Sequence, residues 1–129
     1  MIFHHIGIAV NNIENAQTSY EKLGYKMTLT IIDPIQNVKL CFLDKSDSPT
    51  IELVCPLDDK SPVVSILKKN NAMPYHTCYE VVDIDLEINK LKKNGYIQVS
   101  KTVPAIAFEN RLVCFLYNKN IGLIELLNK

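Results

Sequence analysis

The architecture of this chain follows from the stretch His5-Ile-Gly-Ile-Ala-Val10, which has a counterpart beginning at residue 76, His76-Thr-Cys-Tyr-Glu-Val81. The alignment of His5 with His76 also aligns Lys22, Gly24 and Tyr25 with Lys93, Gly95 and Tyr96. After an insertion of two residues, Cys41-Phe42-Leu43 aligns with Cys114-Phe115-Leu116, and Ile51-Glu52-Leu53 aligns with Ile124-Glu125-Leu126. A repeat in the sequence dictates a repeated architecture. The chain is therefore predicted to contain two copies of one structural unit.

Each copy has the same order of predicted elements: a strand, a helix, and then two or three further strands. The first strands span about residues 3–10 and 75–82, and the later ones 26–32, 38–43, 50–54, 97–102, 112–117 and 122–127. Asn12 and Asp83 precede the helical runs, and Gly24 and Gly95 follow them, as is typical of helix caps. The predicted apolar helix positions are Ile13, Ala16, Tyr20 and Leu23, and then Leu86, Ile88 and Leu91.

This pattern predicts an α+β fold of two tandem βαβββ modules in one compact domain. The modules are expected at residues 1–55 and 75–129, and the segment 56–74 is expected to be an ordered linker with a short helix near Pro62. Pro is frequent in the first turn of a helix.

The composition narrows the possible partners. Of 129 residues, 47% are hydrophobic and 22% are charged, and 14 basic side chains balance 14 acidic ones. The absence of a basic surplus argues against a nucleic-acid partner. The apolar N-terminus is too short to span a bilayer and lacks a basic leader, so the sequence predicts a cytoplasmic protein without a membrane partner. Cys41, Cys55, Cys78 and Cys114 lack zinc-site spacing and are expected to be buried thiols.

The repeat also preserves four residues that a hydrophobic core does not require: His5, His76, Glu52 and Glu125. Each Glu interrupts an apolar strand, where a carboxylate is costly unless it is paired or bound to a cation. Because neighbouring strand residues alternate between faces, Glu52 points away from the face of Ile51 and Leu53. A set of two His and two Glu suits Zn²⁺, Ni²⁺, Co²⁺ or Mn²⁺. His4 has no His counterpart in the second copy and is expected either to have a structural role or to support a ligand residue.

These motifs, together with the segments Ile51–Pro56, Tyr75–Val81 and Gly122–Leu127, resemble those of the vicinal oxygen chelate superfamily. The sequence is most similar to methylmalonyl-CoA epimerases and to proteins like glyoxalase I. The resemblance implies that the two modules curve into one half-open sheet or barrel around a divalent metal, with His5, Glu52, His76 and Glu125 as ligands.

The resemblance also implies a chemistry: an isomerase or epimerase that removes the proton α to the carbonyl of an acyl thioester through a metal-stabilised enolate. Glu125 is the first choice for the base, with Glu52 opposite. A lactoylglutathione lyase of the glyoxalase I type is the second hypothesis. A non-catalytic module that sequesters small molecules is the third, and four filled ligand positions disfavour it.

The substrate is expected to be a small molecule, bound by a homodimer with the site within each chain. Arg111, the only Arg, and Asn110 are candidates for binding an anionic group of the substrate, and a plain surface turn is the alternative. The epimerases place an additional acidic residue near the position of Gln36. Here Asp33, slightly upstream, is the nearest carboxylate.

Overall fold

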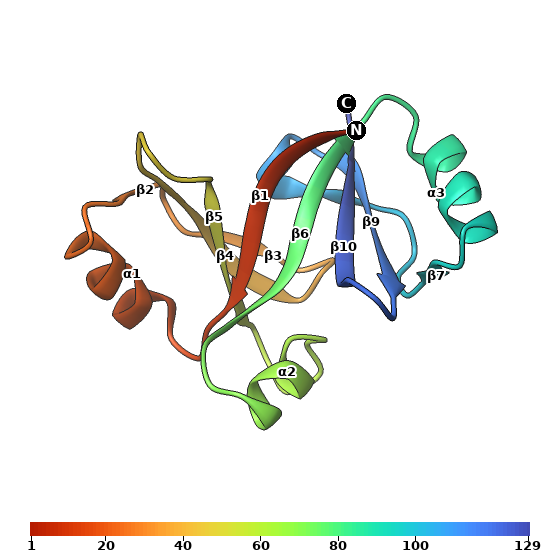
Figure 1. The fold of residues 1–129 in the computed structure, drawn as a ribbon. Helices are drawn as coiled ribbons and strands as arrows, with labels where there is room; N and C mark the ends of the chain where they lie inside the picture. The colour runs from red at the N-terminus through yellow and green to blue at the C-terminus, as the bar shows by residue number, and fades with distance from the viewer. The chain divides into compact units, whose positions relative to one another are not determined.

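The computed structural model describes all residues from Met1 to Lys129 and has a mixed α+β fold, as predicted. Figure 1 shows its elements. The helices are α1 (Ile13–Glu21), α2 (Val64–Lys69), α3 (Ile84–Lys93) and a 3₁₀ turn, η1 (Ile106–Phe108). The strands are β1 (Ile2–Ala9), β2 (Lys26–Met27), β3 (Ile31–Asp33), β4 (Val38–Asp44), β5 (Ile51–Pro56), β6 (Met73–Val81), β7 (Ile97–Gln98), β8 (Val103–Ala105), β9 (Arg111–Asn118) and β10 (Gly122–Asn128). None of the helices has the length and apolar character needed to cross a bilayer.

The residues form two compact units. One, the N-unit, contains His5–Tyr75, and the other, the C-unit, contains His76–Lys129 together with Met1–His4. Both chain termini therefore belong to the C-unit, where the backbone N–H of Lys129 donates to the carbonyl of Val81.

The N-unit has the strand order β2-β4-β5-β1, with β3 also pairing with β4. β1 runs parallel to β5, and β4 runs antiparallel to β5. The C-unit repeats this arrangement as β6-β10-β9-β7, with β8 on β9. β6 is parallel to β10, and β9 is antiparallel to it. The predicted βαβββ order is therefore present in both units.

The predicted strands 26–32 and 97–102 are each shorter and interrupted in the structure. β2 ends at Met27, and Thr28 then places its hydroxyl group where a ladder carbonyl would lie, so that Oγ1 accepts from the N–H of Phe42 at 3.0 Å. Ser100 does the same after β7, accepting from the N–H of Phe115 at 2.8 Å. Side-chain hydroxyl groups that bond to backbone groups compete with regular strand pairing in this way.

α1 and α3 begin at the predicted residues, whereas α2 begins at Val64, so Pro62 precedes that helix and does not lie in its first turn. The side chain of Asn12 accepts from the N–H of Asn15 at 2.7 Å, and that of Asp83 accepts from the N–H of Leu86 at 2.9 Å. Gly24 and Gly95, which follow the helices, have φ values of +89° and +84°, a backbone conformation that favours Gly.

α1 and α3 pack on the cores of their own units through matching residues. Ile13 of α1 packs with Val10, Leu43 and Leu53 of the N-unit. Ile84 of α3 packs with the equivalent core residues of the C-unit, Val81, Leu116 and Leu126. The prediction for two further helix positions was wrong, because Leu23 is 62% exposed and Leu86 is 67% exposed. Leu23 lies beyond the end of α1, and Leu86 is two residues from the buried Ile88, so the two side chains of α3 cannot share one helix face.

We expect Asn12→Ala to lower the free energy of unfolding by about 1 kcal/mol, because it removes the oxygen that accepts from the first turn of α1. Urea denaturation measures this change. The matched control is Asn89→Ala on the exposed middle of α3, where loss of Asn should be neutral or stabilising by up to about 0.7 kcal/mol. Equal effects of the two substitutions would contradict the capping role of Asn12.

Candidate metal-binding and catalytic pairs

In the N-unit, the structure brings His5 of β1 together with Glu52 of β5. His5 Nε2 lies 3.2 Å from Glu52 Oε2. In the parallel register Gly7 is directly opposite Glu52, and His5 shares the face of Gly7 because strand residues alternate. Gly7 has no side chain to fill the space beside the carboxylate. The imidazole of His5 therefore reaches Glu52 diagonally across the two strands.

In the C-unit, the same geometry joins His76 of β6 to Glu125 of β10. His76 Nε2 lies 3.4 Å from Glu125 Oε2. Cys78 stands where the N-unit has Gly7, directly opposite Glu125 in the parallel register. The two units thus contain the same His–Glu pair, built from the same strands in the same register.

Both pairs are buried. The exposed fractions are 0% for His5, 5% for Glu52, 3% for His76 and 2% for Glu125. A buried carboxylate is strongly disfavoured unless another group compensates its charge. An imidazole nitrogen lies beside each carboxylate, and a bound cation would compensate the charge of the carboxylate.

The donor atoms of each pair fit a shared metal ion. Two nitrogen or oxygen ligands, each about 2.1 Å from one ion and separated by an angle between 90° and 109°, are about 3.0 to 3.4 Å apart. The separations of 3.2 Å and 3.4 Å lie in that range. Imidazole nitrogen and carboxylate oxygen are the donors that zinc and neighbouring transition metals use. Each pair therefore has the chemistry and the spacing of a metal half-site.

Sequence reasoning missed two aromatic rings beside these pairs. It assigned Phe42 and Phe115 to buried strands only, yet both are half-buried and lie against the site His residues. The ring of Phe42 is edge-to-face with His5, with centroids 5.8 Å apart, and that of Phe115 is edge-to-face with His76 at 5.2 Å. Strand alternation could have placed both rings on the face opposite the core, because Phe42 lies between Cys41 and Leu43, and Phe115 lies between Cys114 and Leu116.

Arg111 forms an ion pair on the C-unit. Its Nη1 donates to Glu80 Oε2 at 2.7 Å, and its Nε donates to the carbonyl of Phe108 at 3.4 Å. The guanidinium group of Arg111 lowers the pKa of Glu80 below its ordinary value, so this carboxylate stays charged at neutral pH. The repeat equivalents of Glu80 and Arg111 in the N-unit are the buried apolar residues Ala9 and Val38, so this ion pair belongs to the second copy alone.

Asn110, the other predicted substrate contact, is exposed and has a φ of +63°. It follows Glu109, at +56°, in the tight turn between η1 and β9, and its N–H donates to the carbonyl of Ala105 at 3.0 Å. Its backbone therefore shapes the turn that leads to Arg111, and a contact of its side chain with substrate stays a prediction.

Asp33, the carboxylate nearest to Gln36 in the sequence, is completely buried at the end of β3. Its Oδ1 accepts from the N–H groups of Ile35 and Gln36, both at 3.0 Å, and its Oδ2 accepts from Gln36 Nε2 at 3.0 Å. These bonds make Asp33 part of the turn structure.

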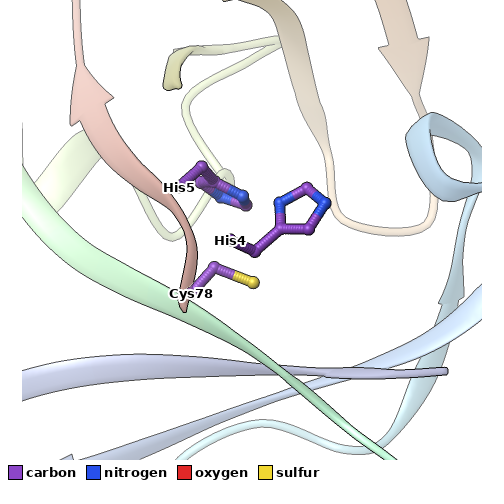
Figure 2. Close-up of side chains that lie close together, drawn as sticks. All are labelled: His4, His5 and Cys78. Carbon is purple, nitrogen blue, oxygen red and sulfur yellow. The ribbon is translucent and has the colours of Figure 1, made fainter. Parts of the chain in front are cut away.

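His4 and the four cysteines complete the reactive side chains. His4 lies edge-to-face against Phe108, with centroids 5.4 Å apart. It also lies close to Cys78 within the C-unit, and Figure 2 shows these two side chains with His5, the next residue along β1. No disulfide joins the cysteines, and all but the half-buried Cys55 are buried. Burial raises the pKa of the thiols of Cys41, Cys55 and Cys114 above the ordinary value, which keeps them protonated.

Comparison with known proteins connects the chain to a family. The family model described as the Glyoxalase/Bleomycin resistance protein/Dioxygenase superfamily matches residues 4–115. The ethylmalonyl-CoA/methylmalonyl-CoA epimerase of Cereibacter sphaeroides is 33% identical over 127 residues, which are 95% of this chain and 94% of that protein.

Solved structures of similar proteins have the same fold. The methylmalonyl-CoA epimerase from Mycobacterium tuberculosis is 27% identical with a TM-score of 0.83, covering 98% of this chain and 86% of that one. A hypothetical protein from Bacillus halodurans C-125 is 30% identical with a TM-score of 0.85, covering 98% and 93% of the two chains.

Proposed function

The chain belongs to the Glyoxalase/Bleomycin resistance protein/Dioxygenase superfamily, and on this premise we propose that it is a divalent-metal-dependent epimerase. Its substrate would be an acyl-CoA thioester whose C2 carries a carboxylate, such as methylmalonyl-CoA. The observation that carries this proposal is the buried His–Glu pair, which occurs once in each unit with the same register and nearly the same separation. The epimerase relatives at 33% and 27% identity support the choice of reaction.

We assign one metal ion to both pairs, so that His5, Glu52, His76 and Glu125 hold it together. The two pairs supply two imidazole nitrogens and two carboxylates, a donor set suited to Co²⁺, Ni²⁺, Zn²⁺ or Mn²⁺. A bound ion would act as a Lewis acid that polarises the thioester carbonyl and so acidifies the proton on C2.

The proton transfer is assigned to the two carboxylates. Epimerisation requires that the C2 proton leaves one face of the substrate and that a proton returns to the opposite face. Glu125 is the proposed base for one face and Glu52 for the other. In both pairs it is Oε2 that lies beside the imidazole, so we assign the proton to Oε1 of each carboxylate. A positioned carboxylate of this kind typically contributes about 10²- to 10⁴-fold to rate.

The direct test is deuterium incorporation at C2 of methylmalonyl-CoA in D₂O, followed by proton NMR, with the protein supplied with Co²⁺. The proposal expects one deuterium per molecule and interconversion of the two epimers. The hemithioacetal of methylglyoxal and glutathione serves as the comparison substrate. Turnover of the hemithioacetal with no exchange in the thioester would replace the epimerase proposal with a glyoxalase-type lyase.

Arg111 is proposed to bind an anionic group of the substrate while Glu80 holds its guanidinium group in place. Arg111→Met keeps the aliphatic stem but removes the charge, and we expect it to raise the KM for the CoA thioester roughly tenfold or more, with little change in kcat. Loss of one charged hydrogen bond, about 1.5 kcal/mol, has this size. Steady-state kinetics measure the effect, and Lys101→Met, an exposed Lys, is the matched control.

The double variant Glu80→Gln/Arg111→Met separates substrate binding from disruption of the ion pair. If Arg111 contacts substrate, the double variant retains the raised KM. Recovery of the wild-type KM would show that the single variant acted only by leaving the carboxylate of Glu80 without its cation.

A further inference from the structure

We propose that Phe42 and Phe115 are positioning residues for the metal site, each of which fixes the orientation of one imidazole ring. The inference rests on the proposed metal site and extends it to residues that would not touch the ion. Phe42 meets His5 at an interplanar angle of 73°, and Phe115 meets His76 at 84°. The contact therefore occurs in both copies of the repeat, with nearly the same geometry.

The two phenyl rings do not belong to the hydrophobic cores of their units. On β4, Cys41 and Leu43 enter the core of the N-unit, whereas Phe42 between them points to the opposite face. On β9, Cys114 and Leu116 enter the core of the C-unit in the same way, and Phe115 does not. Because strand residues alternate, each Phe occupies the face of the His–Glu pair. Core packing therefore does not account for either ring.

Ladder pairing places each ring beside the carboxylate as well as the imidazole. Phe42 is directly opposite Glu52, and Phe115 is directly opposite Glu125. The ring thus covers the side of the pair that faces away from the parallel strand. Its apolar surface limits the access of water to the carboxylate, and a drier pair attracts a cation more strongly.

The backbone of each Phe is itself held by an unusual bond. The N–H of Phe42 donates to the hydroxyl of Thr28, and the N–H of Phe115 donates to the hydroxyl of Ser100. The carbonyl of each Phe also accepts a backbone bond, from Thr28 at 2.9 Å and from Val99 at 3.0 Å. The backbone of each Phe is therefore hydrogen-bonded on the side of its strand that faces away from β5 in the N-unit and away from β10 in the C-unit.

An edge-to-face contact restrains the imidazole because the positive ring edge of one partner meets the negative face of the other. Rotation of the imidazole about its χ2 angle would break this contact. Restraint of a ligand residue by its surroundings is commonly responsible for about 10- to 100-fold of metal affinity. The phenyl ring would thereby hold Nε2 in the direction of the carboxylate and of the ion.

The test uses Phe42→Leu and Phe115→Leu, which keep an apolar side chain but remove the ring. Chelator-stripped protein is titrated with Co²⁺, and the visible absorption bands of the bound ion report its coordination. We expect each variant to weaken Co²⁺ binding about tenfold and to alter the bands. Phe42→Tyr and Phe115→Tyr should restore affinity, because they retain the ring. Phe3→Leu, which removes a similar edge-to-face contact with Tyr79 at 5.9 Å, is the control without an effect on binding.

A second measurement needs no metal. In the metal-free protein, ¹⁵N NMR of the imidazole rings should show that Phe42→Leu perturbs the signals of His5 and leaves those of His76 unchanged, and that Phe115→Leu does the reverse. The inference would be overturned if both Leu variants had the Co²⁺ affinity, the absorption bands and the imidazole signals of the wild type. The two rings would then only fill space beside the His residues. A wild-type protein that shows this imidazole restraint but binds no Co²⁺ would instead overturn the proposed metal site.

Discussion

Replacement of Glu125 with Gln is expected to reduce epimerisation by about 10²- to 10⁴-fold, the contribution of a positioned general base. Gln keeps the shape of the side chain and one oxygen, so the strand pairing of β10 and the packing around the buried position are preserved. What the substitution removes is the basic carboxylate that accepts the C2 proton on one face of the substrate. Interconversion of the two epimers, followed by NMR or by a coupled assay specific for one epimer, measures the loss.

The two carboxylates can be distinguished by supplying each epimer separately in D₂O. If Glu52 and Glu125 serve opposite faces, Glu125→Gln should retain hydrogen exchange in one epimer only, and Glu52→Gln in the other only. Neither variant should interconvert the epimers at a substantial rate. Glu21→Gln, an exposed change of the same kind on α1, is the control. Exchange of the same epimer by both variants would contradict the assignment of one carboxylate to each face.

Removal of the metal should abolish activity and lower the thermal stability of the protein. A ligand present at 1,000 times its Kd stabilises the folded state by about 4 kcal/mol, which corresponds to a Tm shift on the order of 10 °C for a chain of this size. Chelator-stripped protein titrated with Co²⁺, Ni²⁺ or Zn²⁺ should bind one ion per chain and recover this stability.

The His76→Ala variant should weaken that binding by at least about 100-fold, because loss of a ligand costs at least as much as loss of its supporting residues. His4→Ala is the matched control, because it removes an imidazole that is not one of the four proposed ligands. Stoichiometric binding that persists in His76→Ala, or that reaches two ions per chain in the wild type, would contradict a single site that uses both pairs. An absence of binding in the wild type would favour the non-catalytic sequestering module.

Much of the architecture could be predicted from the sequence because its signals are local. Asn12 and Asp83 carry the side chains that cap helices, and Gly24 and Gly95 permit the positive φ that ends them. Alternation along the strand also places Glu52 on the face opposite Ile51 and Leu53, and this prediction does not require knowledge of strand pairing. The repeat supplied the number of units, since two segments with the same pattern form the same elements.

The local pattern of apolar residues gave a wrong strand length where a side-chain hydroxyl group took the place of a backbone hydrogen-bond partner. Nothing in the apolar run 26–32 shows that the hydroxyl of Thr28 would substitute for a ladder carbonyl and interrupt the strand. Leu23 and Leu86 likewise satisfy a coarse apolar pattern, but they lie outside the buried face.

The contacts between residues far apart in the chain depend on tertiary packing. The pairing of His5 with Glu52 depends on a parallel register between β1 and β5, and two strands far apart in the chain carry no local mark of their register. The same holds for the ring of Phe42 on His5 and for Glu80, the partner of Arg111. The repeated elements and the four candidate ligands can be recognised in the sequence alone, because periodicity and residue type are properties of neighbouring residues. The pairing of those ligands within each unit required the folded chain, because contact between distant strands is a property of their packing.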